Sequence, residues 1–133
     1  MKRAILTTLM SAVLAAGLTV GAVNLATAEE NNTKKLIKAL TSDNLGWRVS
    51  AAQILGDNQE ERAMKPLIRM LNNDFSYAAR LSAAVALAKI GDKKTLRALK
   101  KVSKHDRNQT VRTVALGAHE MLENSNAQLA SEK

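Results

Sequence analysis

A repeat of 32 residues constrains the fold of this chain more than any other feature. The sequence RVSAA at residues 48–52 returns as RLSAA at residues 80–84, and a divergent third copy starts at Arg112, so each step is 32 residues. Leu55 and Leu87 share the same offset. Because several positions recur at one spacing without gaps, the chain consists of repeated units, and such units bury their apolar faces by stacking on one another.

Each unit is predicted to be a helical hairpin. In the second unit, the apolar residues from Ala63 to Leu71 follow the 3.6-residue period of a helix, and Asn72-Asn73-Asp74 then interrupts it. A second apolar stretch follows and ends at Gly91, as a helix C-terminus does. No stretch alternates apolar and polar residues in the manner of a strand. The sequence therefore predicts an all-α fold, an α–α superhelix (solenoid) of three helical hairpins.

The helix boundaries follow from the same pattern. We expect helices at residues 33–40 and 46–55, at 60–71 and 75–90, and at 93–104 and 108–122. These give three repeats, at about residues 33–57, 60–92 and 93–122, and leave residues 123–133 as a flexible tail. Residues 31–33 (Asn-Asn-Thr) are expected to cap the first helix. Small residues on the second helix of each hairpin are expected to let neighbouring hairpins approach closely: Ala51, Ala52, Ala83, Ala84, Ala115, Gly117 and Ala118.

The second unit also carries the residues of a known repeat. Residues 63–74 read Ala-x-x-Pro-Leu-x-x-x-Leu-x-x-Asp, and residues 80–92 read Arg-x-x-Ala-Ala-x-x-Leu-x-x-Ile-Gly-Asp. This pattern resembles the HEAT-like repeats, including the short type named after phycobilisome lyases, over about residues 33–122. The resemblance implies an α-solenoid that serves as a protein-binding scaffold. It names no partner, because a fold does not determine a function.

The outer units depart from this pattern. Relative to the repeat, Gly56 comes three residues sooner than Gly91, which predicts a shortened exit from the first hairpin. The third unit places His119 at the core position of Leu87. We interpret these departures as adaptations of terminal repeats that cap the stack.

Residues 1–28 are interpreted as a cleaved signal peptide. Lys2 and Arg3 precede an uncharged stretch at residues 4–23, and Ala26-Thr27-Ala28 supplies a small-x-small cleavage pattern before Glu29. An uncleaved membrane anchor is the alternative, because the uncharged stretch approaches the roughly 20 residues that span a bilayer. With cleavage, the protein is expected in the periplasm, or outside a cell that has no outer membrane.

The composition limits the chemistry. There is no cysteine, which excludes disulfides, thiol chemistry and lipid attachment at the cleavage site. The chain has 20 basic and 12 acidic residues, a net charge of +8, and it keeps +6 without Lys2 and Arg3. The excess lies late, on the predicted first helix of the third hairpin. The candidate polyanion-binding residues there are Lys93, Lys94, Arg97, Lys100, Lys101 and Lys104.

This basic helix has two interpretations. It is either a solvated face or a site for a polyanion, such as lipid phosphate, lipopolysaccharide or an acidic protein. Nucleic acid is the less favoured polyanion, because export separates the protein from chromosomal DNA. In addition, only Trp47, Phe75 and Tyr77 could stack on bases.

Three arginines recur near the start of each predicted second helix: Arg48, Arg80 and Arg112. Asp43, Asp74 and Asp106 precede them by five or six residues, in the turns between helices. One interpretation is a ladder of Asp–Arg ion pairs that links the hairpins. The other is a row of arginines that lines a groove for an acidic partner.

Trp47 and Tyr77 fall in or next to the same turns. They either form an exposed binding rim, since aromatic side chains anchor interfaces, or pack between hairpins. The sequence leaves both open.

No catalytic, cofactor or metal site is predicted. His105 and His119 are the only histidines and lack a His-x3-His spacing, and no serine has the signature of a nucleophile. We therefore expect a non-catalytic protein–protein interaction scaffold or adaptor of the periplasm, which binds through the ridge of second helices. Its candidate contacts are Trp47, Tyr77, Arg48, Arg80 and Arg112. The first alternative is a polyanion or membrane-surface binder that uses the basic third hairpin. A second, an enzyme of the bilin-lyase type, rests on the resemblance alone and conflicts with export.

Overall fold

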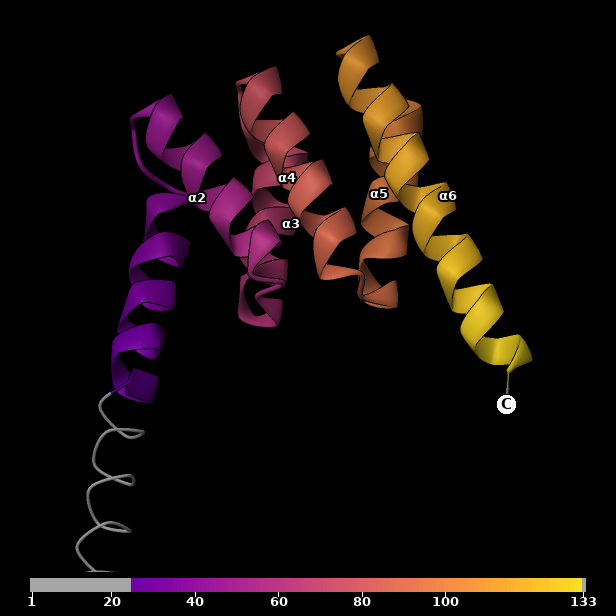
Figure 1. The fold of residues 1–133 in the computed structure, drawn as a ribbon. Coiled ribbons are helices and arrows are strands. Elements are labelled where there is room, and N and C mark those ends of the chain that lie inside the picture. The colour runs from indigo at the N-terminus through magenta and orange to yellow at the C-terminus, as the bar shows by residue number, and fades with distance from the viewer. Residues whose placement is uncertain (1–24, 133) are drawn as a thin grey trace, which may run out of the picture. The chain divides into compact units, whose positions relative to one another are not determined.

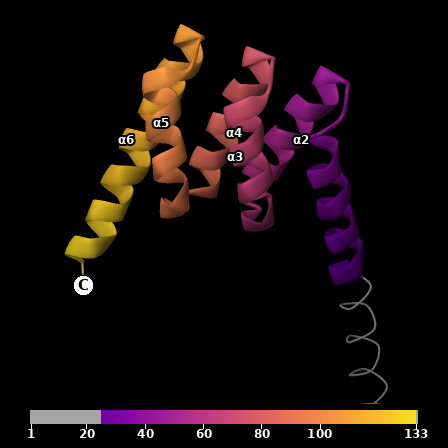
Figure 2. The same ribbon diagram turned by 180° about the vertical axis from the view of Figure 1, so that it is seen from behind.

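Three helical hairpins lie side by side in the computed structural model, which describes residues 25–132 (Figures 1 and 2). The first pairs the end of a helix at residues 25–39 with α2 (Leu45–Asp57). In the second, η1 (Glu61–Ala63) leads into α3 (Met64–Asn73), which pairs with α4 (Tyr77–Ile90). In the third, η2 (Lys93–Thr95) leads into α5 (Leu96–His105), which pairs with α6 (Gln109–Ser131). No strand occurs among residues 25–132, and the all-α prediction is confirmed.

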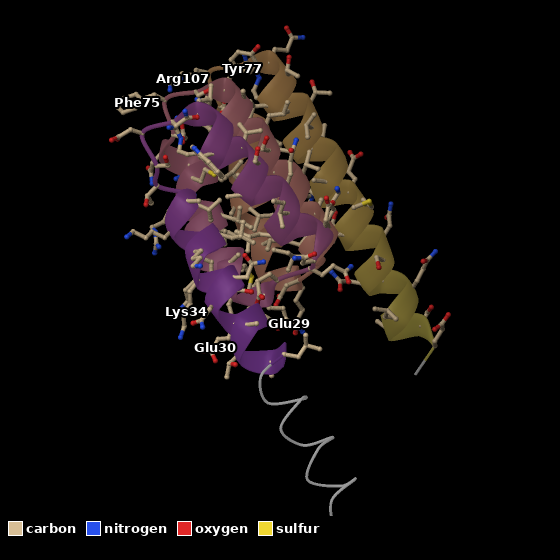
Figure 3. The ribbon with its side chains drawn as sticks, turned by 60° about the vertical axis from the view of Figure 1, so that its left-hand side comes forward. Glu29, Glu30, Lys34, Phe75, Tyr77 and Arg107 are labelled. Carbon is tan, nitrogen blue, oxygen red and sulfur yellow. The ribbon has the colours of Figure 1, made fainter. Side chains whose placement is uncertain are left out.

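The chain divides into two units, residues 1–34 and 35–133, and the hairpins belong to the second. In the first unit, residues 25–34 are helical. Glu30 and Lys34, one turn apart on this helix, form an ion pair with the Lys34 Nζ 2.7 Å from the Glu30 Oε1 (Figure 3).

Most of the predicted signal peptide lies outside the described residues, and its residues 25–28 are helical. Within residues 25–132, none of the helices is both long enough and apolar enough to cross a bilayer.

Two predicted boundaries are wrong. Residues 31–33, expected to cap the first helix, lie inside the helix of residues 25–39. The tail expected to be flexible from residue 123 is helical as far as Ser131, so α6 is 23 residues long. Residues 123–131 contain neither glycine nor proline, and their polar side chains have adequate helix propensity once α6 is anchored by the packing of its first half.

The predicted shortening of the first hairpin's exit is also wrong. Gln59 has a φ of 50°, and it occupies the repeat position at which Gly91 has a φ of 75°. Both hairpin exits therefore pass through a left-handed residue, at the C-cap of α4 and one residue after the C-cap of α2, a conformation that glycine adopts without a steric penalty. At Gln59 the side-chain Nε2 donates a hydrogen bond to the Lys89 carbonyl at 3.1 Å, which links this exit to the end of α4. Gly56 is the penultimate residue of α2 and not the residue that follows the helix.

Close packing between second helices holds the stack together. α2 packs along α4 and α4 along α6, whereas α3 and α5 touch each other far less. A Cβ atom on Gly56 would lie 2.7 Å from the Cα of Ala86, so only glycine permits this approach. The predicted small residues Ala51–52, Ala83–84, Ala115 and Ala118 are buried as expected. Gly117 is the exception, because it is exposed and a Cβ there would have no neighbour within 4 Å.

The core runs through all three hairpins. Its largest fully buried side chains are Leu55, Leu67, Leu71, Leu87, Leu99, Val111 and Thr95. Burying each such leucine contributes about 2 kcal/mol relative to leaving it exposed. His119 occupies the predicted core position of the third hairpin and is only 8% exposed.

Candidate functional site

The turns between paired helices share one edge of the stack, at the N-terminal ends of α2, α4 and α6 (Figure 1). We call this the turn edge; it comprises residues 41–44, 74–76 and 106–108 with the first turns of the helices that follow. Asn44 and Asn108 cap α2 and α6, since each side-chain Oδ1 accepts a hydrogen bond at 3.2 Å from the backbone N–H three residues later. These caps give α2 and α6 a defined start, which positions Arg48 and Arg112.

The repeated arginines form a ladder with aspartates of the next hairpin. Arg48 donates from Nε and Nη2 to the Asp74 carboxylate, at 2.8 and 3.2 Å. Arg80 repeats this contact with Asp106 at 2.8 and 2.9 Å. Each pair is bidentate and joins one hairpin to the next, so the ladder interpretation is confirmed for Asp74 and Asp106. It is wrong for Asp43, whose side chain is exposed and which contributes only its backbone carbonyl, an acceptor for Arg48.

The arginines also bind the turn of their own hairpin. The Nη1 of Arg48 donates to the Ser42 carbonyl at 2.8 Å, and the Nη1 of Arg80 donates to the Asp74 carbonyl at the same distance. These carbonyls near the helix starts compensate for placing a cation at the positive end of a helix dipole. Each guanidinium thus joins its own helix, the turn before that helix and the turn of the next hairpin.

The Arg80–Asp106 pair is nearly buried, with side-chain exposures of 3% and 6%. Burial alone would raise the pKa of Asp106, but the hydrogen bonds from Arg80 and from the Asn108 backbone N–H, with the charges of Arg80 and Arg107, hold this pKa below its usual value. The hydrogen bond to Asp106 outweighs burial in the same way and raises the pKa of Arg80. Both groups are therefore charged at neutral pH.

Arg112 ends the ladder. Its Nη1 donates to the Asp106 carbonyl at 2.7 Å, in the position seen at the other two arginines. Among residues 25–132, no carboxylate pairs with it. Of the three candidate arginines, Arg48 and Arg80 are thus engaged within the stack, and only Arg112 keeps an unpaired edge.

Exposed aromatic side chains mark the turn edge. Trp47 is 66% exposed and Tyr77 55%, so neither packs between hairpins. Phe75, which the sequence did not single out as a partner contact, is 91% exposed in the second turn. Arg107 reaches back to this turn and donates from Nη2 to the Phe75 carbonyl at 2.9 Å, and Figure 3 places Phe75, Arg107 and Tyr77 at one end of the hairpins. An aromatic residue between polar residues of a predicted turn was the available signal for Phe75.

A shallow groove separates the first and second turns. Its floor is mostly apolar, with Leu40 and Met70, and Arg69 and Asp74 add polar groups. Phe75 stands on its rim. A groove of this kind can receive an apolar side chain of a partner while the flanking charges set its orientation.

The predicted basic face is present on the third hairpin. All six candidate residues, Lys93, Lys94, Arg97, Lys100, Lys101 and Lys104, are exposed. On α5 the cations point away from the buried Leu99 and Val102. The one ion pair among them is loose, with the Lys94 Nζ 4.0 Å from the Asp92 Oδ2.

No group of three or more metal-ligating side chains gathers anywhere in residues 25–132. His119 is paired only with Glu123, at 3.7 Å from its Nδ1 to the Glu123 Oε2.

Comparison with known proteins agrees with this architecture. No curated protein matches the chain significantly. A family model described as HEAT repeats matches residues 33–119, which is well over half of the sequence and spans the three hairpins. The chain therefore belongs to the HEAT repeat family.

Proposed function

We propose that this protein is a non-catalytic interaction scaffold or adaptor of the bacterial periplasm, and that it binds a partner protein at the turn edge. HEAT repeats generally mediate protein–protein interaction, and the family is typically non-catalytic. The periplasmic location rests on the signal-peptide pattern of residues 1–28.

The observation that carries the proposal is the exposure of three aromatic side chains at one edge. Trp47, Phe75 and Tyr77 are the only aromatic residues in the chain, and all are more than half exposed. Aromatic residues are enriched at the energetic centres of interfaces, and a small soluble domain ordinarily buries them. The apolar groove beside Phe75 supplies a pocket in which a partner side chain would be desolvated.

Site-specific photo-crosslinking tests this proposal, because it captures a partner whose identity is unknown. The photoreactive amino acid p-benzoylphenylalanine replaces Phe75 in cells, and the periplasmic fraction is irradiated and analysed for adducts. Leu129 is the matched control, because it is 60% exposed and lies near the far end of α6. We expect one discrete adduct from position 75, none from position 129, and loss of the adduct when Trp47 is also changed to alanine. No adduct at position 75, or the same adducts from both positions, would refute the proposal.

The basic face of α5 supports a second candidate function, a polyanion or membrane-surface binder. Its four cations, Arg97, Lys100, Lys101 and Lys104, are exposed on one side of the helix, and no carboxylate of residues 25–132 forms an ion pair with them. Anionic lipid would attract such a face with about 1 kcal/mol per cation near the surface, and salt would weaken the attraction. The discriminating measurement is whether this face or the turn edge carries the binding.

A further inference from the structure

The first and third hairpins, at the two ends of the stack, differ in the residues that they contribute to the Arg–Asp ladder. Every internal junction uses an arginine of one hairpin and an aspartate of the next, as in the pairs Arg48–Asp74 and Arg80–Asp106. A stack has two ends, so it should leave one aspartate position and one arginine position without a partner. The chain treats these two positions in opposite ways.

At the first hairpin, the ladder is closed. The repeat position of Asp74 and Asp106 is occupied by Ser42, which has no charge. The turn itself is preserved, because the Ser42 Oγ accepts a hydrogen bond from the Asn44 N–H at 3.2 Å, as the Asp74 Oδ1 does from the Ser76 N–H at 2.9 Å. Serine therefore keeps the local structure and removes the charge that a preceding arginine would need.

Bulky residues close the same face. Trp47 occupies the repeat position of Ala79 and is 66% exposed, whereas Ala79 is fully buried. Ile54 occupies the position of Ala86, the residue that touches Gly56, and is 42% exposed where Ala86 is 1% exposed. An additional hairpin could not approach α2 on this side as closely as α2 approaches α4.

At the third hairpin, the ladder stays open. Arg112 keeps the hydrogen bond from Nη1 to its own turn, at 2.7 Å, which orients the guanidinium as in Arg48 and Arg80. The Nε and Nη2 edge, which binds a carboxylate at both internal junctions, has no carboxylate partner among residues 25–132. The structure thus presents a bidentate carboxylate site whose geometry the two internal junctions define.

The surroundings of Arg112 favour an acidic, helical occupant. Leu116 is 47% exposed at the repeat position of Ala52 and Ala84, which are fully buried by the hairpin that follows them. Lys100, which is exposed, replaces the partly buried Leu36 and Ile68. The exposed Leu116 therefore lies one turn after Arg112 on α6, and Lys100 adds a second cation on the paired helix α5.

We infer that the face of the third hairpin formed by Lys100, Arg112 and Leu116 docks an acidic helical hairpin of another polypeptide, whose inter-helix turn supplies an aspartate to Arg112. The occupant resembles an internal repeat of this chain in that turn and carries small residues opposite Leu116. A second copy of the same chain is excluded as a head-to-tail occupant by Ser42, Trp47 and Ile54. This inference goes beyond the proposed function, because the contact lies on the end face of the stack, where the turn edge contributes only Arg112.

A variant of this protein can test the docking face, if its first hairpin is changed so that it can bind the third hairpin of another copy. The variant Ser42→Asp/Trp47→Ala/Ile54→Ala gives the first hairpin the residues of an internal junction. The first hairpin of one copy can then pack against the third hairpin of another copy. Each copy then uses its third hairpin to bind one neighbour and its first hairpin to bind another. Association is therefore head-to-tail and forms an open chain of copies. In sedimentation velocity, we expect the weight-average mass of this variant to rise with concentration, while the wild-type protein shows no such head-to-tail growth.

Further substitutions assign the contact. Adding Arg112→Gln to the triple variant should weaken association by at least about tenfold, because the incoming aspartate loses its bidentate partner. Adding Lys65→Gln, a similar loss of one positive charge at an exposed site on α3, should change it little. Far-UV circular dichroism and a thermal melt establish that each variant is folded, and association is measured at a temperature at which all the variants are folded.

The sedimentation experiment has one outcome that supports the inference and two that contradict it. Association that depends on Arg112 supports the inference. A folded variant that stays monomeric, or one whose association is insensitive to Arg112→Gln, overturns it. Neither result affects the crosslinking experiment at Phe75, so the proposed function and this inference can fail independently.

Discussion

Two glycines in second helices should respond in opposite ways to alanine. Alanine is favoured over glycine by about 1 kcal/mol in a helix interior, and Gly56 and Gly117 both lie within helices. At Gly117 a Cβ meets nothing within 4 Å, so Gly117→Ala should stabilise the protein by about 1 kcal/mol. At Gly56 the new Cβ would lie 2.7 Å from the Cα and 2.9 Å from the Cβ of Ala86.

Relief of this overlap requires α2 and α4 to move apart, since the obstructing atoms are backbone and not the end of a flexible side chain. Carbon atoms prefer separations of roughly 3.5–4.0 Å, so the shift needed is about 1 Å. Overpacking of this kind costs about 1–3 kcal/mol, and the loosened ladder and core beside it place Gly56→Ala near the upper end. After the propensity gain, the net destabilisation should be about 1–2 kcal/mol.

Urea unfolding monitored by circular dichroism at 222 nm measures both effects, with the slope against denaturant used to check that unfolding stays two-state. The two variants carry the same chemical change, and the propensity gain at Gly56, in the last turn of α2, is at most that at Gly117 in the interior of α6, so their opposite signs report the contact with Ala86. Equal shifts in the unfolding midpoint would refute the reasoning, because they would mean that the approach of α2 to α4 places no limit on side-chain size.

Four other predictions follow from the ladder, the basic face and the signal peptide. Asp106→Asn should destabilise the protein by about 3 kcal/mol, because it leaves Arg80 buried without an anion. The asparagine keeps the oxygen that accepts the Asn108 N–H in the turn. In the same urea experiment, Asp43→Asn at an exposed site is the control. Since the folded-state pKa of Asp106 is lowered, its contribution is present above the unfolded value, near pH 4, and is lost as the pH falls through the lower folded value; the wild type should therefore lose more stability than Asp106→Asn on acidification below about pH 4. If α5 binds anionic membranes, charge reversal to glutamate at three positions should abolish salt-sensitive flotation with phosphatidylglycerol liposomes, whereas unchanged flotation would exclude that function; the positions are Lys100, Lys101 and Lys104. Mass spectrometry of the exported protein should find an N-terminus at Glu29, and a membrane-bound form that retains Met1 would contradict the signal-peptide interpretation.

The repeat was enough to predict the hairpins and their core, because an offset of 32 residues places equivalent side chains at equivalent depths. Leu55, Leu87 and His119 are buried at one repeat position for this reason. Helix ends were predicted less well, since they depend on local caps. The left-handed conformation of Gln59 could not be predicted, because that conformation is typical of glycine, and Gly56 was taken for a cap because its close contact with Ala86 comes from a neighbouring hairpin.

The residue types of the candidate site could be predicted from the sequence, but not which residue of one hairpin contacts which residue of the next. Arginine and aspartate in each turn indicated a ladder, yet the sequence alone could not show that Arg48 reaches Asp74, because that depends on the distance between hairpins. The exposure of Trp47 depends on whether another hairpin covers that face of α2. The equivalent position in the second hairpin, Ala79, is buried, so periodicity by itself would have placed Trp47 inside.

The ladder also determines how the length of this protein can change. A chain that stopped after Asp92 would keep Arg80, which is 3% exposed, but would lose the carboxylate of Asp106 that neutralises it. A whole additional unit between the second and third hairpins would instead meet an arginine before it and an aspartate after it. Deletion of the last hairpin therefore carries an electrostatic penalty, whereas duplication or deletion of the middle hairpin does not, because either change leaves an arginine facing an aspartate.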